Sequence, residues 1–307
     1  RFSLQGVGRG VWLGHDADLS LLVLDRFTAD HHFPVRQGVG LARKIGADVA
    51  LELIARGQVS CPSIAMTDAD ARLPADYFAR IAELGADCSA AMFPFWHDAD
   101  GGRDMGDMDR ATALYEIRLR YVQRGLRWAH SPYAFHTVGS TMVVHALWYA
   151  LVRGVPRRQA GEDFYLLGKL SKLHPLAYLR GQPVRLRSRL SDRVPFGTGS
   201  ESAKLARGAA VELYHPDVFA AVRDVTHGLQ RLSRDAGVSG HATPGAAVRE
   251  LLSRMRPPVK CFLEAQGASD AWRGISAQAP NPMARLRHLH DWFDGFRTLK
   301  LIHHLRD

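Results

Sequence analysis

The chain has 307 residues, of which 46% are apolar and 23% are charged, so its composition is that of a folded protein and excludes a mainly disordered one. No apolar run reaches the roughly 20 residues that a membrane-spanning helix needs, and we expect no such span in these residues. Forty basic and 31 acidic residues give a net charge of +9, which suits phosphate-bearing ligands, nucleic acid or an anionic membrane surface without choosing among them.

Three cysteines, Cys61, Cys88 and Cys261, lie far apart in the sequence. Because no two of them form a CxxC pair, they predict neither a disulfide framework nor a thiolate zinc site. We therefore expect a reducing compartment, the cytoplasm. The chain opens at Arg1 without a segment typical of signal peptides, and we expect further residues upstream.

The first 200 residues alternate apolar runs with helical patterns, as α/β domains do. Residues 19 to 24 are apolar except for Ser20 and predict a buried strand. Apolar spacing from 41 to 54 predicts a helix that ends at Gly57. Residues 63 to 66 predict the next strand, and residues 77 to 84 the helix that follows it.

The remaining elements are predicted from the same patterns. They are a strand at 88 to 95, helices at 110 to 128, 141 to 153 and 161 to 173, and a strand at 183 to 187. Beyond residue 200 we expect amphipathic helices at 217 to 235, 244 to 256 and 284 to 306, broken by prolines. We therefore predict an α/β domain of residues 1 to 200 and a helical C-terminal extension of residues 201 to 307.

An acidic turn, Thr67-Asp68-Ala69-Asp70, directly follows the strand predicted at 63 to 66. Residues i and i+2 of an extended segment point the same way, so Asp68 and Asp70 can present two carboxylates at one sheet edge. That pair suits Mg²⁺ or Mn²⁺, since such ions are held by one or two carboxylates and by substrate phosphates. Asp-Ala-Asp also occurs at 16 to 18 and 98 to 100, which we interpret as solvated loops.

Three sequence blocks, in this order, resemble glycosyltransferase family 2, whose GT-A fold enzymes use nucleotide-sugar donors. Gly38-Val-Gly-Leu-Ala-Arg43-Lys44-Ile-Gly46 is similar to the family's Gly-x-x-x-Ala-Arg-Asn-x-Gly helix start, the turn at 67 to 70 to its DxD motif, and Gly161-Glu162-Asp163 to its Glu-Asp pair. The likeness covers about residues 19 to 199. It implies a GT-A-like mixed, mostly parallel sheet flanked by helices.

The sequence departs from that family in three respects. Lys44 stands where the family has Asn, and the Gln-x-x-Arg-Trp motif of polymer-making members is absent, which disfavours processive synthesis. The family's first nucleotide-binding strand and helix have no counterpart before residue 19. We therefore expect the pocket for the base and the ribose to be incomplete in this chain.

The resemblance implies a metal-assisted, inverting transfer of one sugar. Asp70 resembles the direct metal ligand, and Asp68 the residue that touches the ribose or assists the ion. Arg43 and Lys44, near a helix start, would hydrogen-bond the donor phosphates. A structural alternative is that Arg43 and Lys44 form a solvated helix face and that Asp68 is a helix cap.

On the acceptor side, Asp163 resembles the family's general base, and Glu162 would orient the acceptor. The alternative is that both acids only favour the helix dipole. In the basic loop at 187 to 199, Arg189 and Arg193 would close over the diphosphate or lie simply at the surface. His174 is a candidate for a further metal ligand.

Two other functions stay open: metal-dependent nucleotidyl or phosphoryl transfer, and non-enzymatic binding of nucleic acid or an anionic surface. Our leading expectation is a nucleotide-sugar donor, an acceptor hydroxyl on a glycan, a lipid-linked molecule or a small molecule, and no nucleic acid. The Arg-rich helices at 217 to 235 and 284 to 306 leave open a peripheral attachment to the inner face of the membrane.

Overall fold

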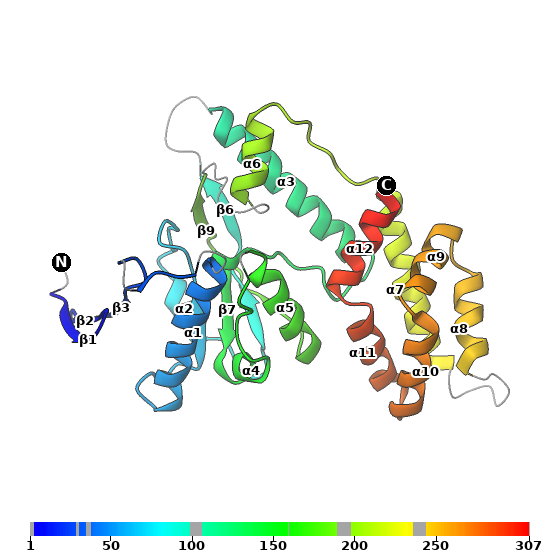
Figure 1. Cartoon of the computed structure of the whole chain (residues 1–307), viewed down its shortest axis with the longest axis horizontal. Helices are drawn as coiled ribbons and strands as arrows, with labels where there is room; N and C mark the ends of the chain where they lie inside the picture. The colour runs from blue at the N-terminus through cyan, green and yellow to red at the C-terminus, as the bar shows by residue number, and fades with distance from the viewer. Residues whose placement is uncertain are drawn as a thin grey trace.

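The computed structural model describes residues 3–28, 31–34, 38–98, 106–158, 160–188, 198–235 and 244–306. Over these ranges the protein has a mixed α/β fold in which helices predominate (Figure 1). The predicted α/β class is confirmed at this level. No helix in the described ranges combines the length and the apolar character that a membrane crossing requires.

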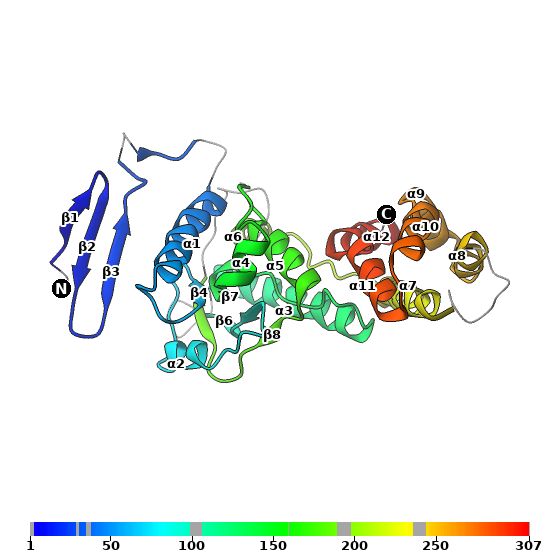
Figure 2. The same ribbon diagram turned by 90° about the horizontal axis from the view of Figure 1, so that it is seen from below.

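Three strands at the N-terminus form a separate antiparallel sheet. They are β1 (Gln5–Gly8), β2 (Val11–His15) and β3 (Ser20–Leu24). Figure 2 shows this sheet at one end of the molecule, on the outer side of α1. Strand β3 matches the strand predicted at 19 to 24, but the prediction that it is buried is wrong, because Leu21 and Leu22 are each 36% exposed. The strand lies outside the central sheet, and its main contacts are with β2.

The central sheet has the strand order β4-β7-β5-β8. Its strands are β4 (Ser63–Met66), β7 (Met142–His145), β5 (Ala90–Met92) and β8 (Ala177–Tyr178). Strand β7 runs antiparallel to β4 and to β5, and only β5 and β8 pair in parallel. The expectation of a mostly parallel sheet is therefore wrong, because β7 is inserted between two strands that point the same way. Two further strands, β6 (Phe95–Asp98) and β9 (Val184–Arg187), form a parallel pair.

Strand β7 is also the largest departure from the predicted secondary structure. One helix was expected over 141 to 153, but the structure has β7 followed by the short helix α4 (Ala146–Leu151). Met142, Val143 and Val144 are at most 1% exposed. A strand buried on both faces is a continuous apolar run without alternation, and such a run cannot be told from a buried helix by periodicity.

Helices cover both faces of the central sheet. Helices α1 (Val39–Ala55), α4 and α5 (Glu162–Leu173) pack on one face around a core that includes Met142 and Val144. Val143, which alternates with these residues along β7, belongs to the core on the other face. Helices on that side are α2 (Tyr77–Ala82) and the long α3 (Asp107–Trp128).

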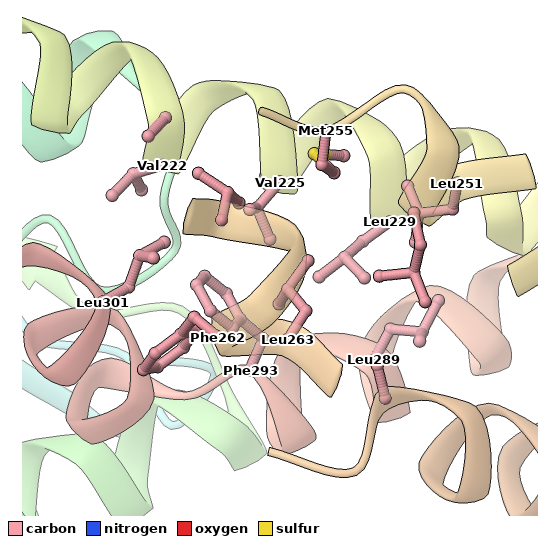
Figure 3. Close-up of a cluster of buried hydrophobic side chains, with 14 of the residues drawn as sticks. Val222, Val225, Leu229, Leu251, Met255, Phe262, Leu263, Leu289, Phe293 and Leu301 are labelled. Carbon is pink, nitrogen blue, oxygen red and sulfur yellow. The ribbon is translucent and has the colours of Figure 1, made fainter. Parts of the chain in front are cut away.

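The regular secondary structure in the described residues of the C-terminal part consists of helices. Its helices are α6 (Thr198–Ala206), α7 (Pro216–Asp235), α8 (Pro244–Ser253), α9 (Pro257–Ala265), α10 (Ala268–Gln278), α11 (Pro282–Trp292) and α12 (Gly295–Arg306). Figure 3 shows part of the apolar core that α7 to α12 share, with Leu229, Phe262 and Leu301 among its side chains.

Two boundaries differ from the prediction. Pro257 and Pro258, expected to break the chain, begin α9, because proline is tolerated in the first turn of a helix. The helix expected at 284 to 306 is divided into α11 and α12. Asp294 stands at the division and accepts hydrogen bonds from the backbone amides of Phe296 and Arg297, at 3.1 and 3.0 Å, which caps the second helix.

Helix α3 connects the two parts of the molecule. It contacts β6 near the central sheet and α7 in the helical part. At the α7 contact, Gly125 lies against the buried ring of Phe219, and a Cβ on Gly125 would lie 2.6 Å from three ring carbons. The close approach of these helices therefore depends on the missing side chain.

We predict that Gly125→Ala lowers the free energy of unfolding by about 1 to 3 kcal/mol, because the new methyl group overpacks the α3–α7 contact. The control is Gly274→Ala in α10, where a Cβ meets nothing within 4 Å. That variant should gain about 0.5 to 1 kcal/mol from helix propensity. Urea denaturation followed by circular dichroism measures both, and equal shifts in the two variants would contradict the tight contact.

Candidate active site

Arg43 is the centre of the candidate site. It lies early in α1, and its side chain is only 12% exposed. The start of α1 is fixed against the loop that precedes α5, since a Cβ on Gly40 would lie 2.5 Å from the carbonyl oxygen of Arg158. The guanidinium of Arg158 in turn stacks 3.8 Å from the ring of Tyr165 in α5. These contacts hold α1 and α5 together and set the direction of Arg43.

The Arg43 guanidinium joins the acidic turn to the start of α5. Its Nη2 donates a hydrogen bond to Oδ1 of Asp68 at 2.7 Å, and its Nη1 donates to Oε1 of Glu162. Glu162 is 3% exposed, whereas Asp68 is 35% exposed. Charge-assisted hydrogen bonds of this kind are stronger than neutral ones. One residue from each of the three sequence blocks therefore meets at a single guanidinium.

Asp163 lies beside this cluster, at the N-terminal end of α5. Its Oδ1 accepts a hydrogen bond from the backbone amide of Phe164 at 2.7 Å. Burial, and then the neighbouring Glu162 charge, raise the pKa of Asp163 to about 6, although Arg43 and the amides of Phe164 and Gly139 act in the opposite direction. A carboxyl group that titrates near neutral pH is suited to accept and release a proton.

Two glycines permit this packing. Gly139 lies next to the Arg43 guanidinium, where a Cβ would overlap Nη1. Gly161 precedes α5 with φ at +73°, a left-handed conformation that glycine adopts without strain. Sequence analysis did not assign a role to Gly139, because its partner is 96 positions away and no local pattern links the two residues.

Asp68 and Asp70 line one cleft, between α1 and the end of β4. The cleft has a volume of about 740 Å³, and Arg43, Ala47 and Gly46 of α1 form its opposite wall. Within the described ranges no three His, Cys, Asp or Glu side chains are grouped as metal ligands. Two carboxylates on one cleft nevertheless fit an Mg²⁺ or Mn²⁺ ion whose other ligands are waters and substrate phosphates.

Lys44 lies apart from this cluster. Its Nζ is 2.8 Å from Oδ2 of Asp48, and Asp48 also accepts a hydrogen bond from the Tyr149 hydroxyl at 2.7 Å. Arg43 lines the cleft, whereas Lys44 is not among the residues that line it. The predicted role of Lys44 in donor binding is therefore not supported by its position.

The other predicted residues are placed as follows. His174 follows the last turn of α5, about 17 Å along the helix from Asp163, and its ring lies beside Trp148. This position does not support a role for His174 as a metal ligand beside Asp163, because the length of α5 lies between them. Arg189 and Arg193 lie outside the described residues.

We predict that Arg43→Met lowers the free energy of unfolding by about 3 to 5 kcal/mol, because it leaves the buried Glu162 carboxylate without its cation. In a Glu162→Gln background the same substitution should cost less, since no buried charge is then left unpaired. Chemical denaturation of the four proteins gives the coupling energy. A coupling below about 0.5 kcal/mol would show that the pair is energetically independent.

The raised pKa of Asp163 also predicts a pH dependence of stability. Between the ordinary value of 3.8 and about 6, the folded protein keeps a proton that the unfolded chain has lost. Asp163 therefore contributes stability that is fully present below about pH 4 and is lost as the pH rises through 6. The side-chain amide introduced by Asp163→Asn would be neutral at every pH, and its oxygen would still accept the Phe164 amide.

Asp163→Asn should therefore match the wild type near pH 4 and exceed it by up to about 3 kcal/mol near pH 8. Thermal unfolding of both proteins across this range is the measurement. If the difference between them stays constant with pH, the pKa of Asp163 is not raised in the folded protein.

The comparisons with known proteins identified no relative of this chain. A scan against protein-family models, a search of curated proteins and a search of solved structures each found no match to the chain. The site is therefore described by its own residues: a guanidinium that joins two carboxylates, a neighbouring carboxyl with a raised pKa, and an acidic cleft.

Proposed function

We propose that the protein is a metal-assisted, inverting glycosyltransferase that moves one sugar from a nucleotide-diphosphate sugar to an acceptor hydroxyl. The observation that carries this proposal is the contact of Arg43 with both Asp68 and Glu162, beside Asp163. These residues come from the three separate blocks that resemble glycosyltransferase family 2. Their convergence supports a common task, because residues of a solvated helix face and of two independent helix caps need not meet.

The donor occupies the cleft between α1 and the acidic turn in this proposal. Asp68 and Asp70 would hold the Mg²⁺ or Mn²⁺ ion, which offsets the negative charge that grows on the leaving diphosphate. Arg43 orients Asp68 through their hydrogen bond. Helix α1 begins near the cleft, and the positive end of its dipole favours the phosphates there.

Asp163 performs the proton transfer. Its carboxylate accepts the proton of the acceptor hydroxyl while the hydroxyl oxygen bonds to the anomeric carbon and the bond from that carbon to the diphosphate oxygen breaks. Attack from the side opposite the leaving group inverts the anomeric configuration. With a pKa of about 6, Asp163 is mostly ionised at neutral pH and still basic enough to accept a proton. Glu162, engaged by Arg43, is a positioning residue.

A second candidate function is metal-dependent nucleotidyl transfer, because two carboxylates on one cleft also serve that reaction. The products distinguish the two reactions. Sugar transfer releases a nucleoside diphosphate, whereas nucleotidyl transfer from a nucleoside triphosphate releases pyrophosphate.

The test is to incubate the protein with uridine, guanosine, adenosine and thymidine diphosphate sugars and Mn²⁺, and to measure released nucleoside diphosphate. We predict that Asp163→Asn lowers this rate about 100-fold or more while donor binding, measured by calorimetry, is unchanged. In the wild type, kcat/KM should rise with pH and level off above about 6, as the base loses its proton.

The donor cleft has its own control. A Cβ on Gly46 meets nothing within 4 Å and faces the cleft, so Gly46→Leu should fold normally and lose donor binding. Gly274→Leu, an equally open helical position outside the cleft, should retain it. Full activity in both Asp70→Ala and Asp163→Ala would refute the site, and pyrophosphate as the product would favour the second candidate.

A further inference from the structure

A second cavity, of about 590 Å³, lies between α3, α5 and α12. This volume is within the usual range for small-molecule sites. Its walls include Leu119 and Val122 of α3, Phe164 and Gly168 of α5, and Phe296 and Leu299 of α12. The cavity therefore lies where the helical C-terminal part meets the α/β part, and it is separate from the donor cleft.

The cavity is elongated along two helices. Its lining residues on α3 run from Tyr115 to Leu126 at helical spacing, a distance of about 17 Å. Those on α5 run from Phe164 to Lys172, about 12 Å. Phe164 directly follows Asp163 in the chain. Asp163 does not itself line the cavity, and the end of the cavity at Phe164 is one residue along α5 from the proposed general base.

The walls favour an uncharged, apolar ligand. Leu119, Val122, Leu126, Phe164 and Leu299 line the cavity and are only partly buried. Apolar surface left in contact with water is unfavourable, and a ligand that covers it is bound more tightly.

The charged side chains on the wall are engaged with one another or with the backbone. Arg118 pairs with Glu201 at 3.0 Å, and Lys172 pairs with Asp294 at 2.9 Å. The remaining lysine of the wall, Lys169, donates a hydrogen bond to the carbonyl oxygen of Val152 at 3.1 Å. The two ion pairs neutralise four of these charges, and the Lys169 ammonium has a hydrogen-bond acceptor.

We propose that this cavity holds the alkyl chain of an amphiphilic acceptor, whose hydroxyl-bearing head group lies at Asp163. This inference rests on the proposed function and names the acceptor class for the same site. A space that extends along two helices and has mainly apolar walls fits an alkyl chain better than a compact polar sugar. In this proposal α12 contributes to acceptor binding, because Phe296 and Leu299 form part of the cavity wall.

Gly168 provides the test. It lines the cavity from α5, and a Cβ there meets nothing within 4 Å, so Gly168→Leu should fill the space without displacing the fold. Gly274→Leu is the matched control, because it has the same open surroundings and lines neither cavity. Val122→Phe narrows the cavity from the α3 side and serves as a second variant if Gly168→Leu does not fold.

The probes are n-dodecyl β-D-glucopyranoside, below its micelle concentration, and methyl β-D-glucopyranoside, which has the same head group without the chain. We expect calorimetry to show saturable binding of the dodecyl glucoside alone to the wild type and to Gly274→Leu. Gly168→Leu and Val122→Phe should each weaken this binding about tenfold or more. Equal affinity in the wild type and both cavity variants, or no preference for the dodecyl compound, would overturn the inference.

Donor binding in the same proteins separates this inference from the proposed function. If the wild type binds a nucleotide sugar but not the dodecyl glucoside, the alkyl-chain assignment fails and the glycosyltransferase proposal stands. If Gly168→Leu weakens the binding of the dodecyl glucoside but the wild type binds no nucleotide sugar, the proposed function fails. The role of the cavity as an acceptor site then fails with it.

Discussion

The contact of one buried arginine with two carboxylates fixes the geometry on which the rest of the site depends. Arg43 comes from α1, Asp68 from the turn after β4, and Glu162 from the start of α5. Withdrawing such charges from water is costly, and a single unpaired member would be strongly destabilising. The three elements are therefore held in one relative position. The same charges act on Asp163, where burial and Glu162 outweigh Arg43 and leave a carboxyl group that titrates near pH 6.

The central strand of the sheet supports this arrangement from behind. Residues Gly139–Thr141 form a short 3-10 turn directly before β7, so the glycine that admits the Arg43 guanidinium is positioned by that strand. Strand β7 is buried on both faces and pairs with β4, which leads to Asp68. Strand β7 thus positions both Gly139, which lies against Arg43, and strand β4, which leads to Asp68.

The start of α5 separates two spaces of different chemistry. The acidic cleft lies on the α1 side, and the apolar cavity lies between α5, α3 and α12. In the proposed reaction the donor and the acceptor would approach Asp163 from these two sides, as attack opposite a leaving group requires. The helical C-terminal part would then be a wall of the acceptor site, held in place by the close α3–α7 contact at Gly125.

Local patterns in the sequence determined much of this description. Helical spacing predicted α1, α5 and α7, and an acidic turn directly after a strand identified Asp68, because these signals depend on neighbours within a few positions. Arg43 and Glu162 were singled out by the resemblance of their sequence blocks to glycosyltransferase family 2. Only the tertiary structure decided which residues face one another. The rotation of α1, set by Gly40 against residue 158, turns Arg43 to the cleft, whereas Lys44 pairs with Asp48 one turn along the same helix. Likewise, β7 is a strand because it pairs with β4 and β5 on its two sides. An apolar run in the sequence does not indicate which elements will bury it.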